Sequence, residues 1–170
     1  MKKNNLRLMC MTSVFSALIF VVTAYLHIPS HLGYIHIGDG FIYLAACILP
    51  APYAVFASAA GAALADLLTG YAVWAPGSAL IKAVTAVLFS CKGAKILSAR
   101  NKLMLAPAAI VCAGGYYLYQ GLIFGSFRAA LSGIPGSLVQ SVASTIAFLL
   151  ISIYMDKLKL KDKLTEGFKL

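Results

Sequence analysis

Residues 129–155 read AALSGIPGSLVQSVASTIAFLLISIYM and contain no charged side chain. Residues 8–26 and 103–127 are uncharged in the same way. Each run exceeds the roughly 18 apolar residues that a helix needs to cross the hydrocarbon of a bilayer. The apolar residues are continuous rather than alternating with a period of two, which favours helices over the strands of a membrane barrel. These three stretches therefore predict transmembrane helices.

The composition of the whole chain agrees with a lipid environment. Of the 170 residues, 61% are hydrophobic and 11% are charged, whereas an ordinary soluble domain has about 25% charged residues. One soluble core of this size cannot hide so much apolar surface, so lipid must solvate much of it. The first run has a basic start like a signal peptide, but it is too long and ends without a small-x-small cleavage site. We predict that it is a retained helix.

The middle of the chain adds three helices to this set. Asp39 is the only charge between residues 35 and 65, and Pro50 and Pro52 interrupt that run where a turn is expected. A loop follows, and Pro76 suits the first turn of the next helix. The sequence therefore predicts one all-α membrane domain, residues 1–170, built as an integral bundle of six transmembrane helices. These span about residues 8–26, 38–49, 51–68, 76–90, 103–124 and 134–156.

The lysines and arginines predict how this bundle is oriented. They cluster before the first helix, between the fourth and fifth helices, and after the sixth. With six helices all three clusters fall on one side, which the positive-inside rule makes cytoplasmic. We therefore expect both termini in the cytoplasm and the protein in the plasma membrane. The net charge of +9 is a topology signal, and without a soluble basic module we expect no nucleic-acid partner.

Signatures of catalysis and of nucleotide binding are missing from the sequence. It has no Gly-x-x-x-x-Gly-Lys-Ser/Thr phosphate loop, no Gly-x-Ser-x-Gly and no His-Glu-x-x-His. The four cysteines are scattered through apolar runs without a Cys-x-x-Cys pair, which predicts no disulfide framework. The histidines at positions 27, 31 and 36 are irregularly spaced, which favours loop residues over a metal site. We expect no enzyme, no catalytic residue, no cofactor and no metal.

A set of polar and aromatic side chains near the outer ends of the predicted helices forms a candidate ligand site. Ionisable groups in a membrane are costly and usually face an interior cavity or a partner. Aromatic walls with a few polar groups suit a small flat ligand. The candidate binding residues are His36, Asp39, Asp66, Tyr71, Trp74, Lys82, Tyr116, Gln120 and Gln140.

Simpler structural roles remain open for most of these residues. Asp39 could cap the second helix, a position that aspartate fills well. Asp66 and Lys82 could form a structural ion pair across the short loop between their helices. Trp74 and the tyrosines could belong to an interfacial aromatic belt. On the first predicted helix, Ser13 and Ala17 form a small-x-x-x-small pair, and such pairs let helices approach closely in lipid.

Several motifs carry a resemblance to a known family. They are IHIGD at 35–39, DLLTGY at 66–71, WAP at 74–76, LIK at 80–82, and Gln140 early in the last helix. Together they resemble the substrate-binding (S) components of energy-coupling-factor (ECF) vitamin transporters, most closely the riboflavin-transporter-type branch. The resemblance implies an outward-facing pocket. This pocket would hold either a vitamin or a precursor that is similar to a vitamin or a nucleobase. This pocket is made by the outer halves of helices four to six and the neighbouring loops.

The same resemblance implies partners. An S component docks onto a transmembrane coupling subunit powered by two ATPases, and toppling of the S component in the bilayer delivers the ligand inward. The first helix of the family typically carries an Ala-x-x-x-Ala docking motif, and this chain has Ser13 and Ala17 instead. Branch members handle flavins, pyridoxine-type and hydroxymethylpyrimidine-type compounds, and the wider family includes queuosine-precursor transporters. The sequence does not choose among these substrates, and a membrane scaffold subunit without a ligand is the alternative function.

Overall fold

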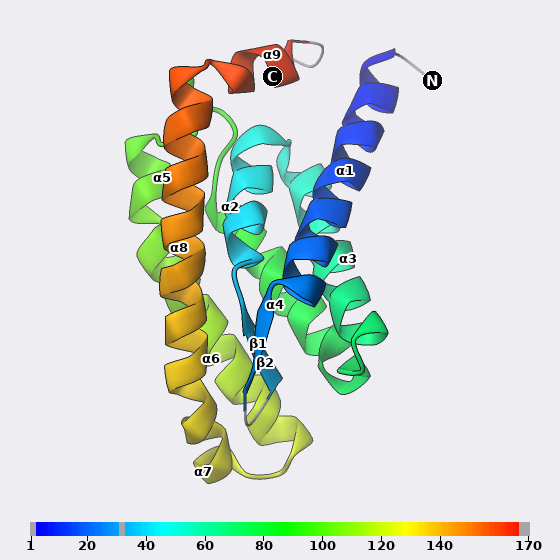
Figure 1. Ribbon diagram of the computed structural model, residues 1–170, viewed down its shortest axis with the longest axis vertical. Helices are drawn as coiled ribbons and strands as arrows, with labels where there is room; N and C mark the ends of the chain where they lie inside the picture. Colours follow the sequence, from blue (N-terminus) through cyan, green and yellow to red (C-terminus); the bar gives the residue numbers. More distant parts are fainter. Residues whose placement is uncertain (1–2, 31–32, 167–170) are drawn as a thin grey trace.

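Most of the chain is helical, with one short β-hairpin. The computed structural model describes residues 3–30 and 33–166 (Figure 1). The long helices are α1 (Lys3–Tyr25), α2 (Asp39–Ile48), α3 (Ala51–Leu68), α4 (Ala75–Leu88), α6 (Leu105–Ile123) and α8 (Ile134–Lys157). The shorter elements are β1 (His27–Ser30), β2 (Gly33–His36), η1 (Ala72–Trp74), α5 (Ala99–Leu103), α7 (Phe127–Ala130), η2 (Leu131–Gly133) and α9 (Leu160–Thr165).

Four helical stretches in the described part of the chain are long and apolar enough to cross a membrane. They are Asn5–Tyr25, Ala51–Leu68, Ala99–Ile123 and Phe127–Lys157. Two further apolar helices, Asp39–Ile48 and Ala72–Leu88, are shorter. At 1.5 Å per residue α2 is about 15 Å long, roughly half the thickness of the hydrocarbon layer. All residues of α2 except Phe41 are buried, so this helix lies inside the bundle.

Each of the six predicted helices corresponds to one long helix of the structure. The predicted range 51–68 agrees with α3, and the ends of the other ranges differ from the observed ends by a few residues. The short helix α5 precedes α6 and was not predicted. Prolines set several of the starts. Pro52, Pro76 and Pro135 occupy the first turns of α3, α4 and α8, where the missing N–H is not needed.

The hairpin between α1 and α2 departs from the predicted all-helical chain. β1 and β2 pair antiparallel, with His27 opposite His36 and Ser30 opposite Gly33. The chain then turns into α2 through Gly38, where a Cβ atom would overlap the hydroxyl of Thr23. This close approach requires glycine and holds the start of α2 against α1.

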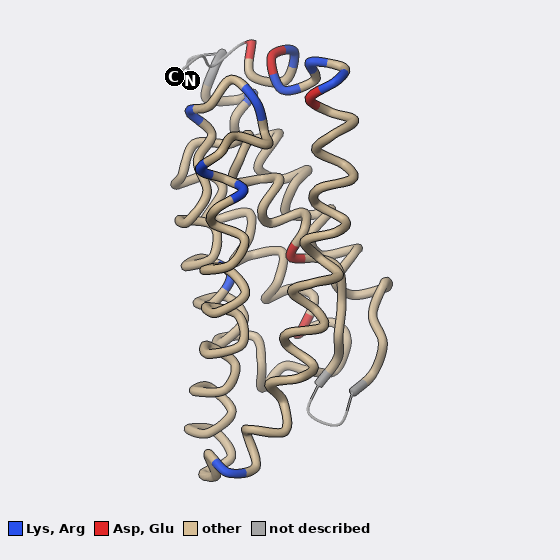
Figure 2. Tube along the Cα trace, turned by 90° about the vertical axis from the view of Figure 1, so that its left-hand side faces the viewer, with Lys and Arg blue, Asp and Glu red and all other residues tan. Residues whose placement is uncertain are grey.

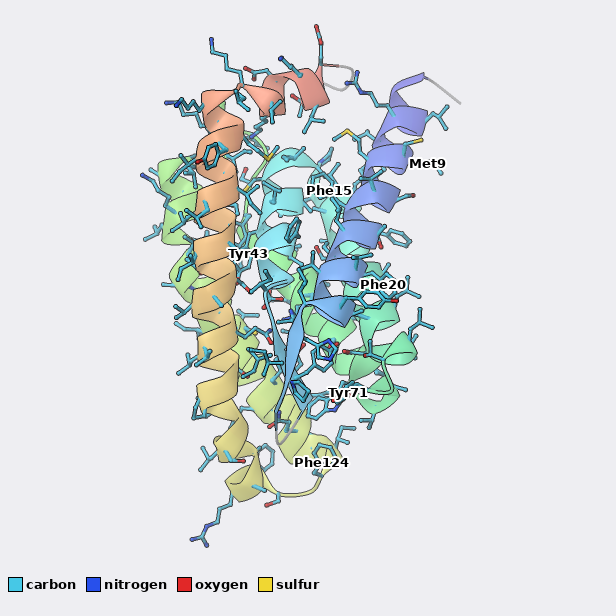
Figure 3. All side chains as sticks on the ribbon, in the orientation of Figure 1. Met9, Phe15, Phe20, Tyr43, Tyr71 and Phe124 are labelled. Carbon is cyan, nitrogen blue, oxygen red and sulfur yellow. The ribbon has the colours of Figure 1, made fainter. Side chains whose placement is uncertain are left out.

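The apolar core fills the half of the bundle that contains the termini. Tyr43 of α2 stacks on Phe89, with ring centroids 4.8 Å apart, and meets Phe148 of α8 edge-on at 5.8 Å. Phe15 and Ile19 of α1 complete this core. In Figure 3, Phe15 and Tyr43 lie in the upper half, whereas Tyr71 lies in the lower half. The lower half contains the hairpin and the polar side chains described below.

Both termini lie at the same end of the bundle, and most lysines and arginines gather there (Figures 1 and 2). Arg7 of α1 donates a hydrogen bond to the carbonyl of Lys163 at 3.0 Å. Asp156, at the end of α8, accepts from the backbone N–H groups of Ile96 and Leu97 at 2.8 and 3.0 Å. These contacts bring the three predicted basic clusters together, although Lys2 and Lys169 lie outside the described residues. Helix α7, which contains Arg128, lies at the opposite end (Figure 1).

Candidate functional site

A cavity lies in the half of the bundle away from the termini, between the hairpin and helices α3, α4, α6 and α8. Its volume is about 60 Å³. Seven of the nine predicted binding residues line it, and they come from six separate elements. They are His36, Asp66, Trp74, Lys82, Tyr116, Gln120 and Gln140. The convergence of residues so far apart in the sequence makes this cavity the candidate site.

Lys82 lines the cavity and forms an ion pair with Asp39, which does not itself line the cavity. The ammonium of Lys82 lies 2.8 Å from one carboxylate oxygen of Asp39 and donates to the other at 3.0 Å. Gln140 donates to Asp39 as well, at 3.0 Å. Both charged side chains are only 1% exposed. The positive charge of Lys82 is therefore balanced within the protein.

This ion pair corrects two of the structural alternatives. Asp39 is the first residue of α2, and its side chain caps no helix N–H; the cap residue is Gly38. Lys82 pairs with Asp39 rather than with Asp66. Lys82 pairs with Asp39 because the two residues lie at the same depth within the bundle. Because α2 is short and buried, its first residue lies inside the bundle at the level of the α4 lysine.

Asp66 has a different partner. One oxygen of its carboxylate accepts a hydrogen bond from the hydroxyl of Tyr34 in β2. Its other oxygen, Oδ2, is buried and has no hydrogen-bond partner among the described residues. The side chain is 3% exposed, so bulk water does not solvate it. Asp66 thus joins α3 to the hairpin and leaves one oxygen free beside the cavity.

Aromatic rings form the end of the cavity away from the termini. Trp74 lies 6.3 Å from the ring of Tyr116 and 6.1 Å from that of Tyr119, whose hydroxyl donates to the carbonyl of Val73 at 2.7 Å. Tyr71, another of the predicted binding residues, is not among the residues that line the cavity. Its ring packs on Tyr34 at 4.7 Å and supports the hairpin from behind.

His36 ends β2, outside the membrane-spanning helices. Its side chain is buried, and its Nδ1 accepts a hydrogen bond from the N–H of Gly38 at 3.1 Å. An accepting nitrogen carries no proton, so the ring is neutral in this arrangement. Burial favours the same state and lowers the pKa of His36 from 6.5 to about 4. His36 therefore contributes a neutral ring to the cavity wall.

Four polar side chains that the prediction did not include also line the cavity: Thr23, Tyr34, Ser78 and Ser137. Ser78 precedes Lys82 by four residues, a spacing that places both on one face of a helix. In the sequence, Pro29, Ser30 and Gly33 form a cluster of turn-prone residues close to Tyr34, and this hairpin signal would have placed it. Thr23 has no such local signal, because it is one hydroxyl in a long apolar run.

The predicted docking residues lie on a free face of α1. Ser13 and Ala17 are both exposed, and the hydroxyl of Ser13 donates to the carbonyl of Met9 at 3.0 Å within the helix. Ser13 also borders a shallow groove between α1 and the start of α3, lined in part by Pro52 and Phe56. Small side chains on an exposed helix face leave room for another helix.

The family model of the S component of the ECF-type riboflavin transporter matches residues 3–157. The chain belongs to this family. A search of the curated proteins found no match. The matched range contains every residue that lines the cavity. The predicted resemblance is therefore confirmed. The S component is a membrane protein of vitamin uptake, with a binding role in transport rather than an enzymatic one.

Proposed function

We propose that this S component captures a small heterocyclic vitamin or vitamin precursor from outside the cell in the cavity beneath Trp74. The observation that carries the proposal is the convergence of His36, Asp66, Lys82 and Gln140 on one cavity with aromatic walls. Such a mixture of ring faces and a few polar groups suits a flat ligand with hydrogen-bonding edges. A scaffold subunit would have no need to bring these costly polar groups together.

The proposed setting is the plasma membrane, with residues 1–170 as one domain of six transmembrane helices and both termini in the cytoplasm. The gathering of basic residues at the end that contains the termini supports this orientation. The cavity lies in the other half, so it faces outward. In this arrangement α2 is a buried half-length helix that carries Asp39 to the base of the cavity.

Transport requires partners, which we propose to be an ECF transmembrane coupling subunit and two ATPases. The chain itself has no phosphate loop, so ATP hydrolysis must occur elsewhere. The exposed Ser13 and Ala17 of α1 support this helix as the docking face. Movement of the whole S component in the bilayer then delivers the ligand inward.

Mass spectrometry of small molecules retained by the purified protein tests the binding function. We expect a heterocyclic compound in stoichiometric amount, released on denaturation.

Trp74→Ala removes a ring face from the cavity wall. It should weaken ligand binding at least about tenfold, within the range for loss of a buried contact, whereas Trp74→Phe should retain most of the affinity. Absence of any retained compound, together with no thermal stabilisation by flavins, pyridoxine-type compounds or pyrimidines, would contradict the proposal.

A further inference from the structure

One acidic side chain on the cavity wall, that of Asp66, has no cationic partner among the described residues. Lys82 is balanced by Asp39 at 2.8 Å, and His36 is neutral because its Nδ1 accepts the N–H of Gly38. The remaining charged group on the cavity wall is Asp66. Within residues 5–29 and 34–166, whose side chains the structure describes, no lysine or arginine pairs with Asp66. Asp66 is therefore the group on the cavity wall that is still open to pairing with a ligand.

The free oxygen of Asp66 needs a donor. Tyr34 satisfies Oδ1, and Oδ2 is buried without a partner among the described residues. A carboxylate oxygen can only accept hydrogen bonds, and an unpaired buried charge is costly. A ligand with a positively charged N–H group fits this position, because the positive charge keeps Asp66 ionised and the N–H supplies the missing hydrogen bond to Oδ2.

The rest of the lining accommodates such a ligand. Gln120 is 5% exposed and Thr23 is 2% exposed, and both have a buried oxygen without a partner in the described part of the chain. An amide and a hydroxyl can each donate or accept, so they adapt to either kind of ligand edge. The ring of Trp74 also lines the cavity, and aromatic faces attract cations. The ring of Tyr116 already has the ammonium of Lys82 over it, 4.9 Å from its centroid.

We propose that the substrate is a small planar heterocycle with an amino group or another basic nitrogen, which donates to Oδ2 of Asp66. Ligand analogues that carry a carboxylate or phosphate in place of the basic nitrogen bind more weakly, because two acidic groups then meet in a buried site. The inference rests on the proposed binding function and narrows its ligand.

Matched ligand pairs test this inference on the purified full-length protein in lipid nanodiscs. The first pair is pyridoxamine and pyridoxic acid, which share a ring and differ in an amine or a carboxylate. The second is an aminopyrimidine carrying a hydroxymethyl group and the corresponding pyrimidinone, and riboflavin is the neutral three-ring comparison. Calorimetry gives each Kd. We expect the tightest binder to be an amine, with its partner at least about tenfold weaker, the range for a lost buried hydrogen bond.

Two variants at one position tie the preference to Asp66. Asp66→Asn removes the negative charge and should reduce the preference for the amine to less than about threefold, whereas Asp66→Glu should keep it. Should Asp66→Asn fail to fold, the pairs still decide the question on the unaltered protein. Tightest binding of riboflavin or of an acidic ligand, or an undiminished amine preference in Asp66→Asn, would overturn the inference and leave the binding function intact. Absence of binding by every compound, with no retained ligand, would contradict the binding function itself.

Discussion

Lys82 and Asp39 depend on each other at the scale of single residues. Both are 1% exposed, and Gln140 completes the partners of the carboxylate. Removing one member of a buried ion pair leaves the other charge unsolvated, at a cost of about 3–5 kcal/mol. We therefore predict that Lys82→Met lowers the thermal unfolding temperature of the purified protein by several degrees.

The double variant Lys82→Met with Asp39→Leu is the control, because it removes both charges. It should recover much of the lost stability, since an apolar pair of similar volume often replaces a buried ion pair at little cost. Unchanged stability in Lys82→Met would show that the pair contributes nothing to folding. If Lys82→Met keeps its thermal stability but no longer binds the ligand, the role of Lys82 is to contact the ligand rather than to stabilise the fold.

His36 predicts a pH dependence. Burial lowers the pKa of its imidazole from 6.5 to about 4, so the folded protein binds fewer protons than the unfolded chain between these values. The free energy of unfolding therefore falls as the pH decreases from 6.5 towards 4, by at most about 1.4 kcal/mol per pH unit. Thermal unfolding of wild type and His36→Gln over this range measures the effect. The variant should show a shallower slope, and equal slopes would exclude His36 as the source.

At the scale of secondary-structure elements, α1 has two faces with different tasks. Phe15 and Ile19 pack into the core, whereas Ser13 and Ala17 are exposed. If the exposed face docks the coupling subunit, bulk at these positions blocks the approach of a partner helix. We predict that Ser13→Leu or Ala17→Leu abolishes uptake by cells while ligand binding to the isolated S component persists.

Val14→Leu is the matched control, because Val14 is exposed but lies off the stripe formed by Ser13 and Ala17. It should leave uptake unchanged. Uptake assays and binding by the purified protein must be made on the same variants. Equal loss of binding and uptake in Ala17→Leu would mean that α1 supports the cavity rather than the docking face.

The hairpin is the element that closes the cavity on one side. It is attached to the helices by the Tyr34 hydroxyl on Asp66, by the contact of the Tyr34 ring with Tyr71, and by the hydroxyl of Ser144, which donates to the carbonyl of His36 at 3.4 Å. A volume of about 60 Å³ is smaller than the roughly 150 Å³ of an engineered cavity that holds benzene. Entry of a ring-sized ligand therefore requires a wall of the cavity to move.

At the scale of the whole molecule, the distribution of charge predicts the topology. The basic clusters gather at the end that contains both termini (Figure 2), and the positive-inside rule makes that end cytoplasmic. A reporter fused after Leu170 and another inserted between Lys92 and Lys102 should both report the cytoplasm. A third, inserted in the loop after Thr69, should report the outside. A reversed result at any position would contradict six membrane-spanning helices in this orientation.

The sequence by itself determined the class of the protein, the helices and the family. Hydropathy and proline placement act locally, so the runs 8–26 and 134–156 identified α1 and α8 without knowledge of their neighbours. The motifs around Asp39 and Lys82 identified the S component family, which the match over residues 3–157 confirms.

Only the tertiary structure decided which groups meet. Asp39 and Asp66 both lie in apolar surroundings, and nothing in their neighbours along the chain tells which one pairs with Lys82. The choice depends on how deep α2 begins within the bundle and on the hairpin that brings Tyr34 to Asp66. Depth and rotation of packed helices follow from contacts across the whole interior. The acidic group that lacks a cationic partner beside the cavity is therefore a property of the fold and not of any single motif.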